Sequence, residues 1–224
     1  MTLPANALTT VESVNATLGY TTGDDAARDA LIERYIALAS DTIEQMCGRK
    51  FYRATDYAER VPAGQSIYIQ IYDHYPLVSI SSITYDDDTA TTIDSSDYEI
   101  SEADAGMIRN INGGWRNTQV YTFSGPTRYL ATPEALRDWV PAYTVTYTGG
   151  YITPQQEDDG VGDRTLPFDL EQAAIDAAVS QYYQRTRDKG VSSVGMGRSS
   201  VSYGSANSTE LLQSVISRYR VVTI

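Results

Sequence analysis

The chain has 224 residues, of which 42% are hydrophobic and 21% charged, and its formal net charge is -12. This acidic balance, without any cluster of Lys and Arg, argues against direct binding to nucleic acid or to an anionic membrane. A single Cys and a single His exclude internal disulfides and Cys-rich or His-rich metal sites, so we expect no metal and no cofactor. The first residues lack a basic segment followed by an apolar core, so we expect a cytosolic chain without a secretory signal.

The first 50 residues predict two helices, each followed by a glycine. A threonine cap, Thr9 or Thr10, precedes the short segment Val11–Leu18. The longer segment Asp24–Cys47 starts with acidic residues and ends at Gly48, which suits a left-handed C-cap. Apolar side chains recur along it at spacings of three and four residues, which predicts one buried face made of Ile32, Ile36, Ala39, Ile43 and Met46.

Beyond Phe51 the period of the apolar pattern changes from about 3.6 residues to 2 residues. Turn-forming Asp, Asn and Gly residues separate the short runs. The 18 tyrosines, against 3 phenylalanines and 2 tryptophans, suit half-buried sheet faces and protein interfaces. The pattern predicts an antiparallel sandwich or barrel with strands at Ser66–Tyr72, Leu77–Tyr85, Tyr98–Ser101, Gly106–Ile111, Gln119–Phe123 and Tyr143–Thr148.

Helical patterns return near the end of the chain. A helix opening at Pro167 is predicted to bury one face made largely of small residues, namely Leu170, Ala174, Ala177, Ala178 and Tyr182. The segment Asp188–Ser208 is rich in Gly and Ser and has no helical period, so we expect it to be disordered or functional. A last amphipathic helix is predicted over Thr209–Tyr219.

These elements predict an α+β fold in which the terminal helices pack as a small bundle and carry an inserted antiparallel β-sandwich or barrel-like domain. We expect the helical domain to comprise residues 1–50 and 165–224. The inserted β domain is expected at residues 51–152, and residues 153–164 are expected to form an acidic linker loop.

Motifs for catalysis are nearly absent. The sequence contains neither a phosphate-binding GxxxxGK[ST] loop nor a GxSxG elbow. His74 is predicted to be a surface residue and Cys47 a buried residue at a helix end, and the acidic runs at 86–88 and 157–159 to be solvated turns. Two alternatives stay open: an acid-pair hydrolase, because sequence does not show which carboxylates converge, and a carbohydrate-binding β-sandwich module with exposed tyrosines as sugar platforms.

An ordered series of short motifs runs through almost the whole chain. They are MCGRKF at Met46–Phe51, PLVSISSI at Pro76–Ile83, DYEI at Asp97–Ile100, VTYTGGY at Val145–Tyr151, LPFDL at Leu166–Leu170, SVSY at Ser200–Tyr203 and RYR at Arg218–Arg220. In this order they resemble the head–tail connector (adaptor) proteins of tailed bacteriophages. The chain departs from compact members of that family at residues 126–141 and 155–164.

The resemblance implies a non-enzymatic structural protein of the virion neck, assembled in the host cytoplasm into a ring that is commonly twelve-fold. Such a ring docks beneath the portal protein, meets a tail terminator or stopper protein, and continues the channel through which genomic DNA passes without specific binding. We predict that contacts with the portal or with neighbouring copies involve Arg198, Val201, Tyr203, Arg218, Tyr219, Arg220 and Val222.

Overall fold

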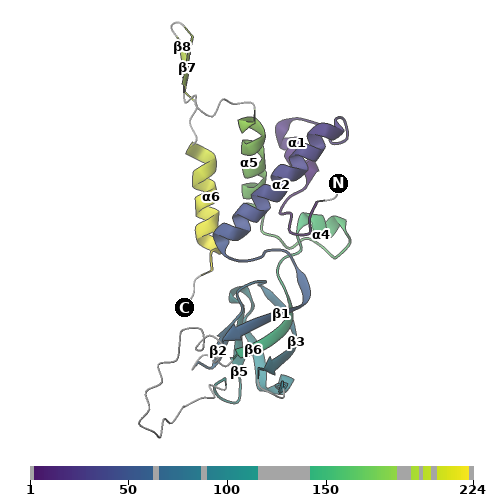
Figure 1. Ribbon diagram of the computed structural model, residues 1–224, viewed down its shortest axis with the longest axis vertical. Coiled ribbons are helices and arrows are strands. Elements are labelled where there is room, and N and C mark those ends of the chain that lie inside the picture. The colour runs from purple at the N-terminus through teal and green to yellow at the C-terminus, as the bar shows by residue number, and fades with distance from the viewer. Residues whose placement is uncertain are drawn as a thin grey trace, which may run out of the picture. The chain divides into compact units, whose positions relative to one another are not determined.

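The computed structural model describes residues 3–62, 66–86, 90–115, 142–185, 193–196, 199–202 and 206–221. It divides into two compact units (Figure 1). The helical unit comprises Met1–Tyr52 with Tyr151–Ile224, and the strand unit comprises Arg53–Gly150. The expected mixture of helices with antiparallel sheets is confirmed.

The first two helices have the bounds that their caps predict. Helix α1 covers Val11–Leu18, and helix α2 covers Ala26–Cys47. The side chains of Thr10 and Asp25 accept hydrogen bonds from backbone N–H groups of the first turns, which satisfies donors that have no partner within the helix. Gly48 ends α2 with φ of 70°, a conformation that glycine adopts without steric cost.

The buried face of α2 differs from the predicted face at one position. Four of the five predicted residues are buried, but Met46 is 49% exposed. Cys47 lies inside instead and is fully buried. Each helical residue turns by about 100°, so Cys47 falls on the side of Ile43 that faces the core and Met46 falls on the side that faces solvent.

The C-terminal part of the helical unit contains more regular structure than expected. The segment expected as an acidic linker contains helix α4 (Pro154–Asp158), which Thr153 and Gln156 start with a capping box. Helix α5 covers Phe168–Gln184, and α6 covers Ala206–Tyr219, three residues longer at its start than predicted. No helix in the described part of the chain is long and apolar enough to span a bilayer.

Part of the Gly- and Ser-rich segment forms a two-stranded antiparallel sheet. Strand β7 (Ser193–Met196) pairs with β8 (Ser199–Ser202). Of the two alternatives expected for this segment, disordered or functional, disorder is wrong for these eight residues, because inter-strand backbone bonds supply an order that a helical period does not reveal. Residues 186–192, 197–198 and 203–205 of this region lie outside the described residues.

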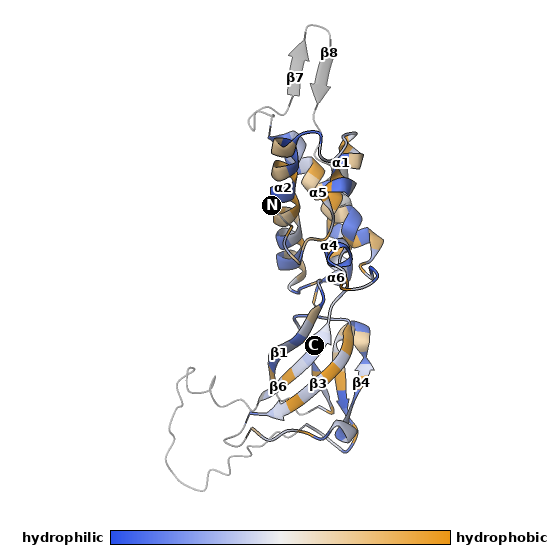
Figure 2. Cartoon of the chain, turned by 90° about the vertical axis from the view of Figure 1, so that its right-hand side faces the viewer, coloured by the Kyte–Doolittle hydropathy of each residue, from blue (hydrophilic) through white to orange (hydrophobic). Residues whose placement is uncertain are grey.

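The core of the helical unit joins residues from both ends of the chain. Hydrophilic and hydrophobic bands mix along α2 and α5 (Figure 2), as expected for helices that bury one face. On α5 the predicted residues are buried except Ala177, which is only partly buried. One cluster consists of Leu8, Ile43, Cys47, Phe51, Leu166, Leu170, Ala173, Ala174 and Val215. A second consists of Ala7, Val14, Ile32, Ile36, Ala39, Ile175, Ala178 and Tyr182.

The strand unit contains two open three-stranded sheets, so its described strands do not close into the barrel that was one expectation. The first sheet has the order β1-β6-β3, with β1 at Ala54–Pro62, β6 at Ala142–Gly149 and β3 at Leu77–Tyr85. The second has the order β2-β5-β4, with β2 at Tyr68–Gln70, β5 at Met107–Asn110 and β4 at Tyr98–Glu102. The predicted strand Gln119–Phe123 lies outside the described residues.

Strand β1 was not predicted, and its buried positions explain why. Val61 is fully buried, Tyr57 is half-buried, and between them the inward position is Glu59, which is only 8% exposed. A buried glutamate breaks the alternation of apolar and polar residues by which a half-buried strand is recognised. The remaining core of this unit is apolar and aromatic, and it includes the fully buried Tyr147.

Candidate interface site

The end of α6 is fixed to the start of α5 through one carboxylate. The Nη1 atom of Arg218 lies 2.7 Å from Oδ2 of Asp169, and the Tyr219 hydroxyl donates to Oδ1 of the same residue at 2.9 Å. Asp169 lies in the first turn of α5 and Arg218 in the last turn of α6, so each charge also has the sign that its helix end favours. The pair therefore joins two helix ends as well as complementing their dipoles.

Tyr219 anchors this turn in the core. Its ring packs edge-on against Phe51, with the ring centroids 6.1 Å apart. Burial, together with the bond to Asp169, raises the pKa of Tyr219 to about 12. The next residues continue the contact, because the Val221 N–H donates to the Cys47 carbonyl at 2.9 Å. Tyr219 is thus part of the fold of the helical unit.

The two arginines of this turn face solvent. The side chain of Arg218 is 69% exposed even though it pairs with Asp169, and Arg220 is exposed as well. Three of the seven predicted interface residues are therefore brought together on one turn. Val201 lies in β8, where it pairs with Val194, and its side chain is outside the description. Arg198, Tyr203 and Val222 lie outside the described residues, so their part in an interface stays a prediction.

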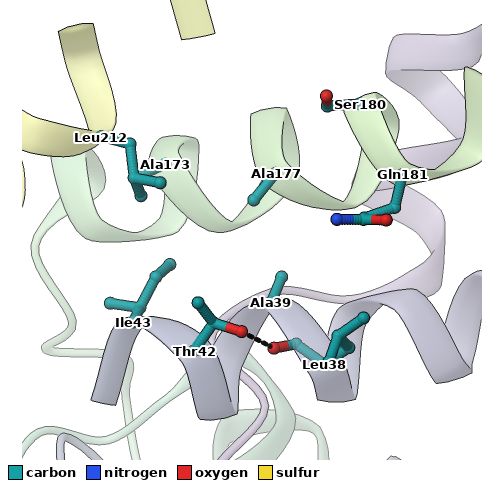
Figure 3. Close-up of a pocket in the computed structure, with 9 residues that line it drawn as sticks. All are labelled: Leu38, Ala39, Thr42, Ile43, Ala173, Ala177, Ser180, Gln181 and Leu212. Carbon is teal, nitrogen blue, oxygen red and sulfur yellow. Dashed lines mark hydrogen bonds between the residues drawn. The ribbon is translucent and has the colours of Figure 1, made fainter. Parts of the chain in front are cut away.

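A groove of ≈170 Å³ runs between α2, α5 and α6 (Figure 3). Leu38 of α2 lies on the rim of the groove and is 50% exposed. On the α5 side, the small side chains of Ala173 and Ala177 leave the groove open. The Thr42 hydroxyl is bonded to the Leu38 carbonyl at 2.7 Å, so its polar atom is already used by its own helix. None of the nine lining side chains is charged: Leu38, Ala39, Thr42, Ile43, Ala173, Ala177, Ser180, Gln181 and Leu212.

Sequence reasoning recognised the small residues of α5 but not this groove. Leu38 and Thr42 fall beside the predicted apolar stripe of α2, on positions that a single amphipathic helix assigns to solvent. The one feature of the sequence that could have indicated the groove is Leu38, an apolar residue outside the predicted buried stripe of α2.

Phe168, the first residue of α5, is 80% exposed. The guanidinium carbon of Arg164 lies 4.5 Å from the centroid of its ring, an arrangement that holds the aromatic face against a cation. Arg164 also pairs with Glu171, one turn further along α5. The sequence predicted Phe168 at a helix start but gave it no function, because the exposure of a side chain does not follow from a local pattern.

The strand unit holds a buried polar cluster in which His74 is only 1% exposed, so its prediction as a surface residue is wrong. Oε2 of Glu59 accepts a bond of 2.6 Å from the Tyr147 hydroxyl, and Oε1 accepts one of 2.8 Å from the Tyr72 N–H. The His74 N–H in turn donates to the Tyr147 oxygen at 3.1 Å. Burial raises the pKa of Glu59 and also that of Tyr147. The cluster fastens the segment after β2 to β1 and β6, which is a structural task.

The cysteine is where the sequence predicted it. Cys47 is fully buried, and burial raises the pKa of its thiol to about 11, so the thiol is protonated at neutral pH and is a poor nucleophile. Among the described residues, no three His, Cys, Asp or Glu side chains lie close enough together to hold a metal ion.

Comparison with known proteins agrees with the ordered motifs. Residues 10–99 match the family described as phage gp6-like head-tail connector protein. Over this segment the chain is similar to head–tail connector proteins. This match confirms the resemblance that the ordered motifs predict. The members of this family are structural phage proteins and not enzymes. No curated protein matches the chain in sequence.

Two solved structures share the fold of this chain along its whole length. One is a chain from a virion of a native gene transfer agent particle, with 18% identity and a TM-score of 0.55. The other is a chain from the neck of an empty gene transfer agent particle computed with C6 symmetry, with 17% identity and a TM-score of 0.57. Each match covers 100% of this chain and 94% of the other chain, so the similarity includes both units.

Proposed function

We propose that this connector is a structural component of a virion neck, where copies of the chain form a ring below the portal protein. The match of residues 10–99 to head–tail connector proteins carries this proposal, because it covers α1, α2 and the first three strands. The fold shared with a chain of a particle neck supports a place in the neck after assembly in the host cytoplasm. In the proposed ring the terminal helices form a small bundle and the strand unit is an inserted β-sandwich.

The charge of the chain suits a passage for DNA. Each copy carries -12, so a ring of twelve copies would carry roughly -144 before counterions screen it. A channel wall with that sign offers few cations that could pair with phosphates, so DNA passes without being held. The genomic DNA is therefore a passenger and not a ligand.

The exposed turn at the end of α6 is the part of the described chain that we assign to the portal or to an adjacent copy. Arg218 and Arg220 are solvent-facing cations on an otherwise acidic protein, and cations at an interface rim favour association with acidic partners. On the opposite side of the ring we propose a tail terminator or stopper protein as the partner.

Purified particles of the phage that encodes the chain provide the main test. Mass spectrometry of the particles and labelling of the chain with an antibody should find it in the neck. Native mass measurement of the purified protein, with and without its portal, should show a multiple of the 24.7 kDa mass bound to the portal ring. Particles whose necks lack the chain would refute the proposal.

The Gly- and Ser-rich segment provides a second test. Deleting residues 188–208 should leave a folded monomer that does not mount on its portal, because we propose that this segment, which contains the paired strands β7 and β8, contacts the portal and neighbouring copies. A variant with the same segment scrambled in sequence is the matched control for length. Normal docking by the deletion variant would show that the segment is not part of the interface.

We infer that the carbohydrate-binding alternative is the weaker one. It requires exposed tyrosines as sugar platforms, and four tyrosines of the strand unit, Tyr75, Tyr85, Tyr143 and Tyr147, are buried. A glycan array with the purified protein should therefore show no specific binding.

A further inference from the structure

We propose that neighbouring copies join by inserting Phe168 of one copy into the groove between α2, α5 and α6 of the next. This inference rests on the proposed ring and names the contact that would close it. Each copy carries both halves, an aromatic side chain that is 80% exposed and an apolar groove of ≈170 Å³. A protein cavity of about 150 Å³ lined by apolar residues accommodates benzene, so the groove has the size that one aromatic ring needs.

The two halves lie on opposite faces of the same helix. Phe168 and Ala177 of α5 are nine residues apart, and a helix that turns about 100° per residue places them about 180° apart around its axis. A copy therefore cannot fill its own groove with its own Phe168. A contact that uses one surface on each side of a subunit is heterologous, and repeated heterologous contacts close into a ring when the rotation between copies allows it.

The chemistry of the groove favours a second copy as its occupant. Two copies that each carry -12 repel one another, so they meet best where at least one of the two surfaces carries no acidic residue. All nine residues that line the groove are uncharged. The guanidinium of Arg164 lies over the Phe168 ring and is paired with Glu171, so this pair brings no net charge to the inserted edge. An exposed aromatic residue at such a place is typical of the central residue of an interface.

Two charge substitutions at exposed positions test the contact with little risk to folding. Phe168→Glu removes the inserted ring and leaves the groove intact, whereas Leu38→Glu places a charge on the groove rim and leaves Phe168 intact. We expect each variant alone to self-associate at least about tenfold more weakly than the wild type in sedimentation experiments. Mixed in equal amounts, they should form a heterodimer that stops at two copies, because only one intact contact is available.

Unchanged self-association of either variant would overturn the proposal, as would a mixture that assembles no better than the separate variants. Met46→Glu is the matched control, because Met46 is 49% exposed on α2 and is not part of the groove lining. It should assemble like the wild type, and a loss equal to that of Leu38→Glu would also count against the groove.

A photoreactive phenylalanine analogue at position 168 identifies what touches this residue in particles and in concentrated purified protein. The expected crosslink joins it to the α2 or α5 peptides that line the groove of another copy, which mixing isotopically labelled and unlabelled chains distinguishes from a link within one copy. The same analogue at Tyr183, which is 60% exposed, is the control. A crosslink to a different neck protein would overturn the groove contact and leave the connector role intact, whereas absence of the chain from particles would refute the connector role itself.

Discussion

The two units each bury a glutamate, and they satisfy it in different ways. In the helical unit, Glu44 is 2% exposed and its Oε2 accepts bonds from Lys50 Nζ at 3.0 Å and Asn6 Nδ2 at 3.2 Å. Its Oε1 accepts a bond from the Phe51 N–H at 3.0 Å. In the strand unit, Glu59 is bonded by neutral groups, the Tyr147 hydroxyl and backbone N–H groups.

The difference follows from what each glutamate joins. Glu44 connects the N-terminal segment, the end of α2 and the chain that leaves it, and its bond raises the pKa of Lys50. Glu59 lies inside a sheet and accepts its hydrogen bonds from neutral donors, and burial raises its pKa. A buried carboxylate paired with a cation favours the ionised form, whereas one bonded by neutral donors carries a desolvation cost at neutral pH.

The two units can be followed separately. Both tryptophans, Trp115 and Trp139, fall within Arg53–Gly150, so tryptophan fluorescence reports on the strand unit. The described α-helices all fall within the other unit, so far-UV circular dichroism at the helical band reports mainly on that unit.

The largest effect is expected for Tyr147→Phe. The change removes the donor to the Glu59 carboxylate and the acceptor of the His74 N–H, and leaves both groups buried. Loss of a bond to a charged group plus an orphaned backbone donor should lower the free energy of unfolding of the strand unit by about 3 kcal/mol. Denaturant unfolding followed by tryptophan fluorescence measures it. A loss below about 0.5 kcal/mol would show that water replaces the hydroxyl.

The next effect compares Glu44→Gln with Glu59→Gln at neutral pH. Glu44→Gln removes the charge that holds Lys50, whose side chain is 47% exposed, so we expect a loss of about 2 kcal/mol in the helical unit after allowing for solvent screening. Glu59→Gln removes a buried charge whose hydrogen-bond donors among the described residues are all neutral, so its cost should be about 1 kcal/mol or less. The reverse order would contradict the comparison between the two glutamates.

The raised pKa of Glu59 predicts a pH dependence of the strand unit. Between its ordinary value of 4.5 and the higher value in the folded state, the folded chain binds more protons than the unfolded chain. The stability contributed by this group is therefore fully present below the ordinary pKa and is lost as the pH rises through the folded pKa. The stability of the wild type relative to Glu59→Gln should fall as the pH is raised from about 5 to about 8. A flat difference would contradict the raised pKa.

The smallest effects are expected where α6 meets α5. Tyr219→Phe removes the half-buried bond to Asp169 and should lower the stability of the helical unit by about 1 kcal/mol. Arg218→Ala, at a more exposed pair, should cost about 0.5 kcal/mol or less. Thermal unfolding followed by circular dichroism measures both. If Arg218→Ala leaves the fold intact but weakens binding to the portal, its exposed guanidinium belongs to the interface as we propose.

Local signals in the sequence correctly predicted those helices and strands whose ends are set by residues close to them in the sequence. The bounds of α1 and the end of α2 follow from caps and glycines a few residues away, and β3 follows from its own alternation. The same reasoning missed β1, because Glu59 occupies an inward position that only a partner from β6 makes acceptable. It also placed His74 on the surface, because the residues that bury it are distant in the sequence.

The acidic charge, the inert cysteine at a helix end, the helix caps and the ordered motifs that resemble connector proteins all follow from the amino-acid sequence alone. These properties depend on composition or on residues within about one turn of each other. Long-range packing instead brings Asp169 to Arg218 and Tyr219, buries Glu59, and leaves Phe168 and Leu38 exposed. Burial and exposure depend on which distant segments pack together, and no local pattern records that packing.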